Sequence, residues 1–163
     1  MGQGIHITPS HGYCILPDAN LLILKVIGHF TTMDFSRWLE EALSNPLYRP
    51  RMNEILDFSL ARFVGGFDNV LQYKDSLVDS DFETRGPFRI AVVAPHDSMF
   101  GSANMFVAMA GCFKVKVSVF RSIIPVLPWL ELEEYAEEVF GCIDTLEAGS
   151  PSSRPSVVPT RSV

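Results

Sequence analysis

Apolar residues first gather in two short runs near the N-terminus, residues 13–16 and 21–27, separated by a polar tetrapeptide. In that tetrapeptide Pro17 presets φ for a turn, and Asp18 and Asn20 bond readily to their own backbone, so the pattern predicts a strand, a tight turn and a strand. The second run is apolar at nearly every position, which is typical of a strand covered on both faces. Gly28 is expected to end it.

An amphipathic helix is predicted next. Apolar residues recur at spacings of three and four with charged residues between them. They are Phe35, Trp38, Leu39, Ala42 and Leu43. Thr31 or Thr32 can cap the start, and Asn45-Pro46 is expected to stop the helix because the residue before proline avoids the α region.

Later segments alternate between strand and helix patterns. Strands are predicted over residues 54–59, 88–94 and 115–120, with helices over 67–82 and 102–112 and a polar loop over 95–101. The resulting order, β-β-α-β-α-β-α-β-α, predicts an α/β fold: a single domain with a mixed, mainly parallel sheet of about five strands flanked by helices.

The C-terminal part is less regular. Pro128 is expected to start a last helix, because proline suits a first helical position. The apolar stripe of that helix is Trp129, Leu132, Ala136, Val139, Phe140 and Ile143. We expect one domain over residues 1–147, with a helical extension from about residue 131, and a Ser/Pro-rich tail over 148–163.

Composition excludes several classes of protein. The 163 residues include 13 basic and 19 acidic side chains, a formal net charge of −6, which argues against nucleic acid as a partner. No run of apolar residues is long enough for a membrane span, and no signal peptide is expected from the first residues. Three widely spaced cysteines without a CxxC motif indicate reduced thiols, so we expect a cytoplasmic protein.

No catalytic or cofactor motif emerges from the residues. Gly65-Gly66 lies where a phosphate loop would, but neither GxGxxG nor GxxxxGK[ST] is present. His96-Asp97-Ser98 has the residue types of a hydrolase triad, yet adjacent residues cannot form the required line of nucleophile, base and orienting carboxylate. We therefore expect no enzyme and no cofactor.

The position of the same three residues has two interpretations. They leave the carboxyl end of a buried strand and precede a helix, which is the usual position of the ligand crevice in an open α/β sheet. Capping of the helix by Asp97 or Ser98 is the first interpretation, and an anion or other ligand at the free N–H groups is the second.

Soft apolar side chains crowd the helix that follows. They are Met99, Phe100, Met105, Phe106, Met109 and Phe113. A plain core face is the first interpretation, and an adaptable apolar pocket is the second.

No metal site is predicted. Five glutamates between residues 131 and 138 are interpreted as a solvated helix face, and His6, His11 and His29 share no metal-binding spacing and are expected at the surface or in turns.

Several short segments together carry a family resemblance. They are Gly28-His29-Phe30, Asp57-Phe58-Ser59, residues 89–95, 100–106 and 119–122, and Trp129-Leu130. Over about residues 5–131 the chain resembles the bacterial STAS-like, SpoIIAA-like proteins, relatives of anti-sigma-factor antagonists that are also compared with CRAL-TRIO lipid-transfer domains. The resemblance implies a non-enzymatic binding or regulatory module that acts through protein contacts or a small bound ligand, and a homodimer.

Candidate ligand-binding residues follow from the strand ends and from this resemblance. They are Asp57, Ser59, His96, Asp97, Ser98, Gly101, Ser102 and Phe106. One departure concerns the serine that phosphorylatable antagonists carry at the start of the next helix. Here Gly65-Gly66-Phe67-Asp68 offers no hydroxyl, which argues against a phosphoserine switch and leaves Ser59 as a weak substitute. A second departure is Pro125 and Pro128, which interrupt the last family helix.

Two other functions stay open. A carrier of an apolar or amphipathic molecule would hold its ligand between the helix after Ser98 and the sheet, in a cavity of roughly a few hundred Å³ or more. An enzyme using Asp57, His96 or Asp97 would require these side chains to converge.

Overall fold

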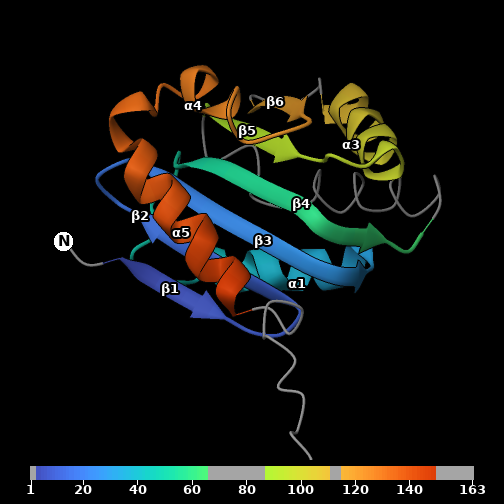
Figure 1. Cartoon of the computed structure of the whole chain (residues 1–163), viewed down its shortest axis with the longest axis horizontal. Helices are drawn as coiled ribbons and strands as arrows, with labels where there is room; N and C mark the ends of the chain where they lie inside the picture. The colour runs from blue at the N-terminus through green and yellow to red at the C-terminus, as the bar shows by residue number, and fades with distance from the viewer. Residues whose placement is uncertain (1–2, 66–86, 111–114, 150–163) are drawn as a thin grey trace, which may run out of the picture.

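The strands of this protein follow one another across the sheet in chain order. A computed structural model describes residues 3–65, 87–110 and 115–149, so the predicted helix over 67–82 and most of the predicted tail lie outside the described residues. The described strands are β1 (Gly4–Ile7), β2 (His11–Leu16), β3 (Leu21–Phe30), β4 (Asn53–Phe63), β5 (Phe88–Val93) and β6 (Val115–Phe120). They form one six-stranded sheet in the order β1-β2-β3-β4-β5-β6 (Figure 1).

The sheet is mixed, as predicted. β1 to β3 pair antiparallel, and β3 to β6 pair parallel. Each parallel strand is added on the same side of the previous one. Because such crossovers are right-handed, the two described helices that lie between parallel strands, residues 32–43 and 97–110, fall on one face of the sheet.

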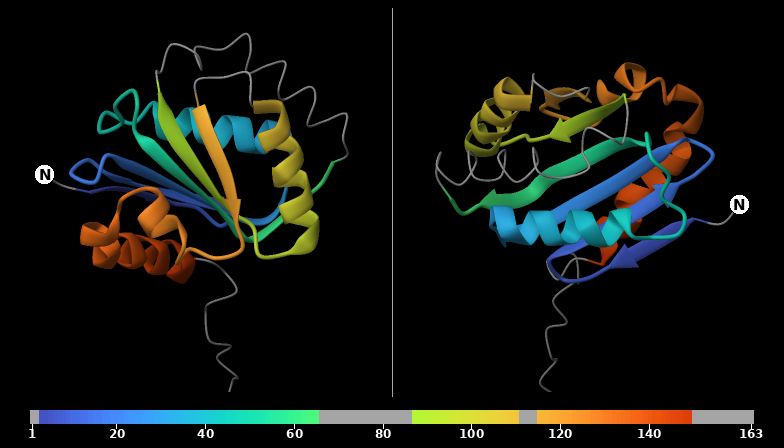
Figure 2. Two further views of the ribbon diagram at one scale, coloured as in Figure 1. Left: turned by 90° about the horizontal axis from the view of Figure 1, so that it is seen from above. Right: turned by 180° about the vertical axis from the view of Figure 1, so that it is seen from behind.

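Helices cover both faces of the sheet (Figure 2). In the part of the chain that the structure describes, they are α1 (Thr32–Leu43), α3 (Asp97–Ala110), α4 (Val126–Trp129) and α5 (Ala136–Ala148), with a 3₁₀ turn η1 at Glu133–Tyr135. α1 and α3 pack on one face, and α4 and α5 on the other. None of the described helices is long and apolar enough to span a membrane.

β3 is the central strand of the core. Its residues from Leu21 to Val26 are fully buried, which confirms that both faces of this strand are covered. Leu22 and Leu24 contact the α1 and α3 side, whereas Leu21 and Ile23 contact the α4 and α5 side.

Two strands run past their predicted C-terminal ends. β3 passes through Gly28 and ends at Phe30. Gly28 has φ of 77°, a left-handed conformation that glycine adopts without strain, so the chain continues in the strand beyond it. The pairing of β3 with β4 shifts register between Lys25 and Ile27, and β4 continues to Phe63. β1 was not predicted at all, since four residues carry too short a pattern.

Two helix boundaries were also predicted wrongly. α3 begins at Asp97, so most of the expected polar loop over 95–101 is helical. Pro128 lies inside the four-residue α4 and does not start the last helix, which begins at Ala136. In α4 the missing N–H of Pro128 costs little, because the first turn of a helix has no intrahelical acceptor for it.

α1 has a well-formed start. The Thr31 hydroxyl accepts a hydrogen bond from the Asp34 amide at 3.2 Å, and the Asp34 carboxylate accepts one from the Thr31 amide at 3.0 Å. These reciprocal bonds form a capping box, and they confirm Thr31 as the cap.

Replacing Thr31 with alanine should lower the free energy of unfolding by about 1 kcal/mol, because it leaves the first turn of α1 without its side-chain acceptor. Urea denaturation followed by circular dichroism measures the change. Thr32→Ala, one residue further on, is the matched control and should cost clearly less. Equal losses in the two variants would contradict the assignment of the cap.

Candidate functional site

An apolar pocket lies at the carboxyl ends of β3, β4 and β5, between α1 and α3. We call it the strand-end pocket. It is lined by Phe30, Thr32, Phe35, Leu56, Phe58, Phe63, Val92, Met99, Ser102, Ala103 and Phe106. It is open to solvent and has a volume of about 90 Å³. Among the described lining residues, Thr32 and Ser102 supply the hydroxyl groups, and the others are apolar.

Phenylalanine rings build the floor of the pocket. Phe30 stacks on Phe58 with ring centroids 5.3 Å apart, and the Phe35 ring is tilted against Phe58 at 5.6 Å. Phe63 tilts against Phe30 at 5.5 Å. Because these rings hold one another in place, the floor is a preformed surface for an apolar group.

The pocket is smaller than a carrier was expected to need. We expected a few hundred Å³, and the stacked rings fill much of the space between α1 and the sheet, leaving about 90 Å³. This volume suits one end of a small molecule and excludes a whole lipid from the pocket as it stands.

Asp57 and Ser59 lie on the opposite face of the sheet. Phe58 points into the pocket, so its two neighbours in the strand point away from it. The Asp57 carboxylate accepts hydrogen bonds from the Lys25 ammonium at 2.8 Å and from the Ser59 amide at 2.9 Å.

Lys25 is the centre of this buried arrangement, which we call the Lys25 cluster. Its side chain is 0% exposed, and its Nζ donates to Asp57 Oδ2 at 2.8 Å, to Ser59 Oγ at 3.0 Å and to Glu147 Oε1 at 3.0 Å. An ammonium group has three protons, so all of them are used. The cluster ties α5 to the sheet, and Lys25 is not available as a nucleophile.

The residues at the start of α3 form a third, exposed location. Asp97 accepts a hydrogen bond from the Arg121 guanidinium at 2.6 Å, and the same guanidinium lies 3.9 Å from the centre of the Phe100 ring. The helix starts at Asp97, so the capping position falls to His96 and neither Asp97 nor Ser98 occupies it. The Asp97 carboxylate also places negative charge where an anion was considered.

The eight predicted site residues therefore do not converge. Ser102 and Phe106 line the strand-end pocket, and Asp57 and Ser59 belong to the Lys25 cluster. The other four are at the start of α3, where Ser98 and Gly101 are exposed. His96 and Asp97 make up the rest of that group.

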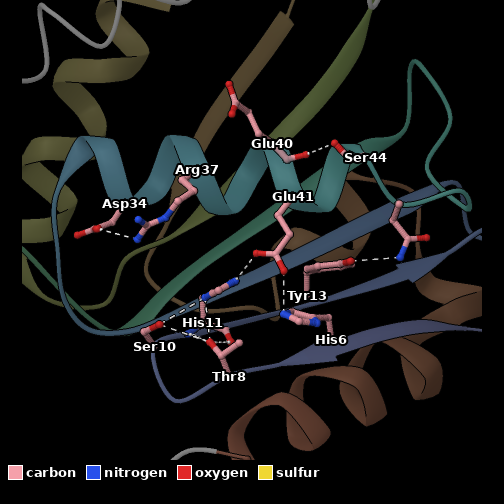
Figure 3. Close-up of polar contacts among 11 residues, drawn as sticks. His6, Thr8, Ser10, His11, Tyr13, Asp34, Arg37, Glu40, Glu41 and Ser44 are labelled. Atoms are coloured by element: carbon pink, nitrogen blue, oxygen red, sulfur yellow. Dashed lines mark hydrogen bonds and ion pairs between the residues drawn. The ribbon is translucent and has the colours of Figure 1, made fainter.

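A cluster that the sequence analysis missed joins β1, β2 and α1 (Figure 3). We call it the histidine cluster: His6, His11 and Glu41. The Nε2 atoms of His6 and His11 lie 2.9 Å and 3.1 Å from the two carboxylate oxygens of Glu41. The three side chains form the kind of group that can hold a metal ion.

His11 was expected at the surface or in a turn, and that prediction was wrong, because the residue is only 4% exposed. Its ring stacks on Trp38 at 4.7 Å. Burial lowers the pKa of His11 below its ordinary value, and this effect outweighs the opposite effect of Glu41. His6 reaches His11 only because β1 pairs with β2, so the cluster could not be predicted without predicting β1.

Two cysteines distant in sequence face each other under α5. Cys14 of β2 and Cys142 of α5 are free thiols in the core. A hydrogen bond with Cys142 and burial both raise the pKa of the Cys14 thiol. A protonated thiol is unreactive, so Cys14 has a packing role.

The Lys25 cluster generates a test of stability. Lys25→Met should lower the free energy of unfolding by about 3–5 kcal/mol, because it leaves the buried Asp57 carboxylate uncompensated. Combining it with Asp57→Leu should restore most of the loss. Glu147, whose side chain is 45% exposed, is the control, and Glu147→Gln should cost at most about 1 kcal/mol. Similar losses for the Lys25 and Glu147 variants would refute the central role of Lys25.

The lowered pKa of His11 generates a test of pH dependence. The unfolded chain binds a proton at this residue near its ordinary value of 6.5, whereas the folded protein binds it only at lower pH. Stability is therefore lost as the pH falls below about 6.5. Urea denaturation in a chelator should show a smaller loss between neutral and mildly acidic pH for His11→Gln. The exposed His29→Gln should retain the wild-type loss, and an unchanged slope in His11→Gln would contradict the argument.

The chain shows a likeness to known proteins among solved structures. No protein-family model matches the sequence, and no curated protein matches it. Among solved structures, the chain is similar to an uncharacterized protein of the DUF3478 family with a SpoIIAA-like fold from Shewanella loihica PV-4. The two share 16% sequence identity over 79% of this chain and 92% of that chain, with a TM-score of 0.44.

Proposed function

We propose that this protein is a non-enzymatic binding module that takes the apolar end of a small amphipathic molecule into the strand-end pocket. The observation that carries the proposal is the lining of that pocket. Its floor consists of stacked phenylalanine rings, and its wall on α3 includes Met99 and Phe106. Hydroxyl groups come only from Thr32 and Ser102 among the described lining residues.

Burial of hydrocarbon supplies the affinity of the pocket for its ligand. Each methylene group that leaves water for an apolar site contributes about 0.8 kcal/mol. Met99 has an unbranched, adaptable side chain, and Phe106 is only partly buried, so both can adjust to the shape of the ligand. The hydroxyls of Thr32 and Ser102 can hydrogen-bond to a polar group that follows the apolar end.

The size of the pocket restricts the ligand. A volume of about 90 Å³ accepts a short alkyl segment or a ring, while the polar end stays in solvent. The occupant is therefore a small amphipathic molecule, and not a diacyl lipid.

The proposal of binding without catalysis rests on the uncharged side chains of the described pocket lining. No described lining residue has a titratable side chain, so acid–base chemistry has no group there. The carboxylates considered for catalysis are engaged elsewhere, Asp57 by Lys25 and Asp97 by Arg121.

A protein partner is the second candidate occupant. Met33 and Val64, 82% and 51% exposed, directly follow the lining residues Thr32 and Phe63. If an apolar side chain of a partner protein entered the pocket, the surface of the partner around it would contact Met33 and Val64. With a protein as the occupant, the chain would act as a regulatory module, or as a homodimer if the partner is a second copy. Both stay predictions.

Filling the pocket tests the proposal. Ala103 is buried in its wall, so Ala103→Leu should occupy the space and weaken binding of octanoate and dodecanoate by at least about tenfold, a loss of about 1.4 kcal/mol. Isothermal titration calorimetry measures the affinity. Ala108→Leu makes the same change at an exposed position of α3 and should bind like the wild type.

Two further observations make this experiment decisive. Circular dichroism must show that both variants are folded, and Phe106→Ala should also reduce binding. Equal affinities in the wild type, Ala103→Leu and Ala108→Leu would place the alkanoate elsewhere and overturn the proposal. A loss of stability in Phe106→Ala without a loss of binding would make that residue part of the core only.

A further inference from the structure

The histidine cluster has the spacing of a metal site. The donor atoms of His6, His11 and Glu41 all lie within 4.8 Å of one another. Ligand atoms placed 2.0–2.1 Å from a tetrahedral ion stand roughly 3.3 Å apart. His6 Nε2 lies 2.9 Å from one oxygen of Glu41 and His11 Nε2 lies 3.1 Å from the other, so each imidazole is near this distance from a different carboxylate oxygen.

Thr8 holds the His11 ring from its Nδ1 side. The Thr8 hydroxyl lies 2.9 Å from the His11 carbonyl and accepts a hydrogen bond from the His11 amide at 3.2 Å. The same oxygen lies 2.9 Å from His11 Nδ1, within hydrogen-bonding distance. Nδ1 is therefore engaged by Thr8, and Nε2 is the ring nitrogen that faces Glu41.

The Nε2 atoms of both imidazoles face Glu41. His11 Nε2 lies 3.1 Å from Oε2 and His6 Nε2 lies 2.9 Å from Oε1, so protons on the imidazoles fill these contacts as hydrogen bonds when no ion is bound. A bound metal ion would take the place of those protons. The Thr8 contact at Nδ1 is the outer-shell hydrogen bond that commonly fixes the orientation of a metal-bound histidine.

Aromatic stacking holds both rings in the required orientation. His11 stacks on Trp38 with ring centroids 4.7 Å apart and an interplanar angle of 14°, and His6 stacks on Tyr13 at 5.3 Å and 28°. Tyr13 is itself fixed by a hydrogen bond between its hydroxyl and the Asn45 amide at 3.1 Å. The donors are therefore preorganised, and Figure 3 shows the two rings and the carboxylate directed toward one another.

We propose that His6, His11 and Glu41 form a binding site for a divalent transition-metal ion, with Zn²⁺ the best match. Two imidazoles and one carboxylate are a donor set that suits zinc, and three protein ligands leave a fourth position open. The side chains of His6 and Glu41 are each 40% exposed, so water or a donor from a partner can reach that position.

A bound ion would connect three elements. β1 is a four-residue strand at the edge of the sheet, and it pairs only with β2 among the described strands. Coordination by one residue from each of β1, β2 and α1 would tie this edge to the helix. The site is separate from the strand-end pocket, since the two share no residue, and it does not depend on the proposed binding of an amphipathic molecule.

The test is titration of the tag-free, chelator-treated full chain with Zn²⁺ and Co²⁺. Calorimetry with Zn²⁺ should give one ion per chain, and Co²⁺ should produce the visible absorption of a four-coordinate ion. Glu41→Gln and His6→Gln should each weaken Zn²⁺ binding by at least about tenfold, since even outer-shell changes have effects of that size.

Matched variants exist for both ligands. Glu40 is the neighbour of Glu41 on α1 and points away from the cluster in Figure 3, so Glu40→Gln should retain wild-type affinity. His29 is exposed on β3, and His29→Gln should do the same. Circular dichroism establishes that all four variants are folded.

Three results would overturn the proposal. The wild type could fail to bind Zn²⁺ at millimolar concentration. Binding could survive in Glu41→Gln and His6→Gln as it does in the controls. The Co²⁺ complex could show the near-ultraviolet charge-transfer band of a thiolate, which would assign the ion to cysteine.

Discussion

The direction in which the parallel strands are added governs the rest of this structure. Because β4, β5 and β6 are each placed on the same side of the preceding strand, right-handed crossovers put α1 and α3 on a single face. The opposite face of β3 and β4 carries Leu21, Ile23 and Ile55, which would be left in water. α4 and α5 cover it, and a buried ammonium with three acceptors joins α5 to the sheet.

The alternation of side chains along β4 separates two kinds of chemistry. Phe58 lies in the strand-end pocket, while its neighbours Asp57 and Ser59 face α5 and satisfy Lys25. A charged network in the pocket would weaken its affinity for hydrocarbon, and an apolar residue beside Lys25 would leave a buried charge unpaired. One strand thus serves ligand binding on one face and stability on the other.

Sequence periodicity predicted the elements that have long apolar patterns. It did not predict the sites that form only when separate elements come into contact. The two-sided burial of β3, the cap of α1 and the mixed sheet were predicted correctly. The histidine cluster was missed because His6 lies on a strand too short to detect, and its partners meet it only after β1 pairs with β2. Of the pocket, Ser102 and Phe106 were predicted, whereas the stacked rings come from separate elements and no spacing along the chain relates them.

The central claim is that the strand-end pocket takes the apolar end of a small amphipathic molecule. Titration with dodecanoate, observed through the ¹³C-labelled methyl groups of methionine, tests it most directly. Met99 lines the pocket, and Met52 is buried outside the pocket lining. The account predicts a saturable shift of the Met99 methyl signal, with that of Met52 nearly unchanged. An unchanged Met99 signal at saturating dodecanoate, or equal shifts of Met99 and Met52, would contradict it.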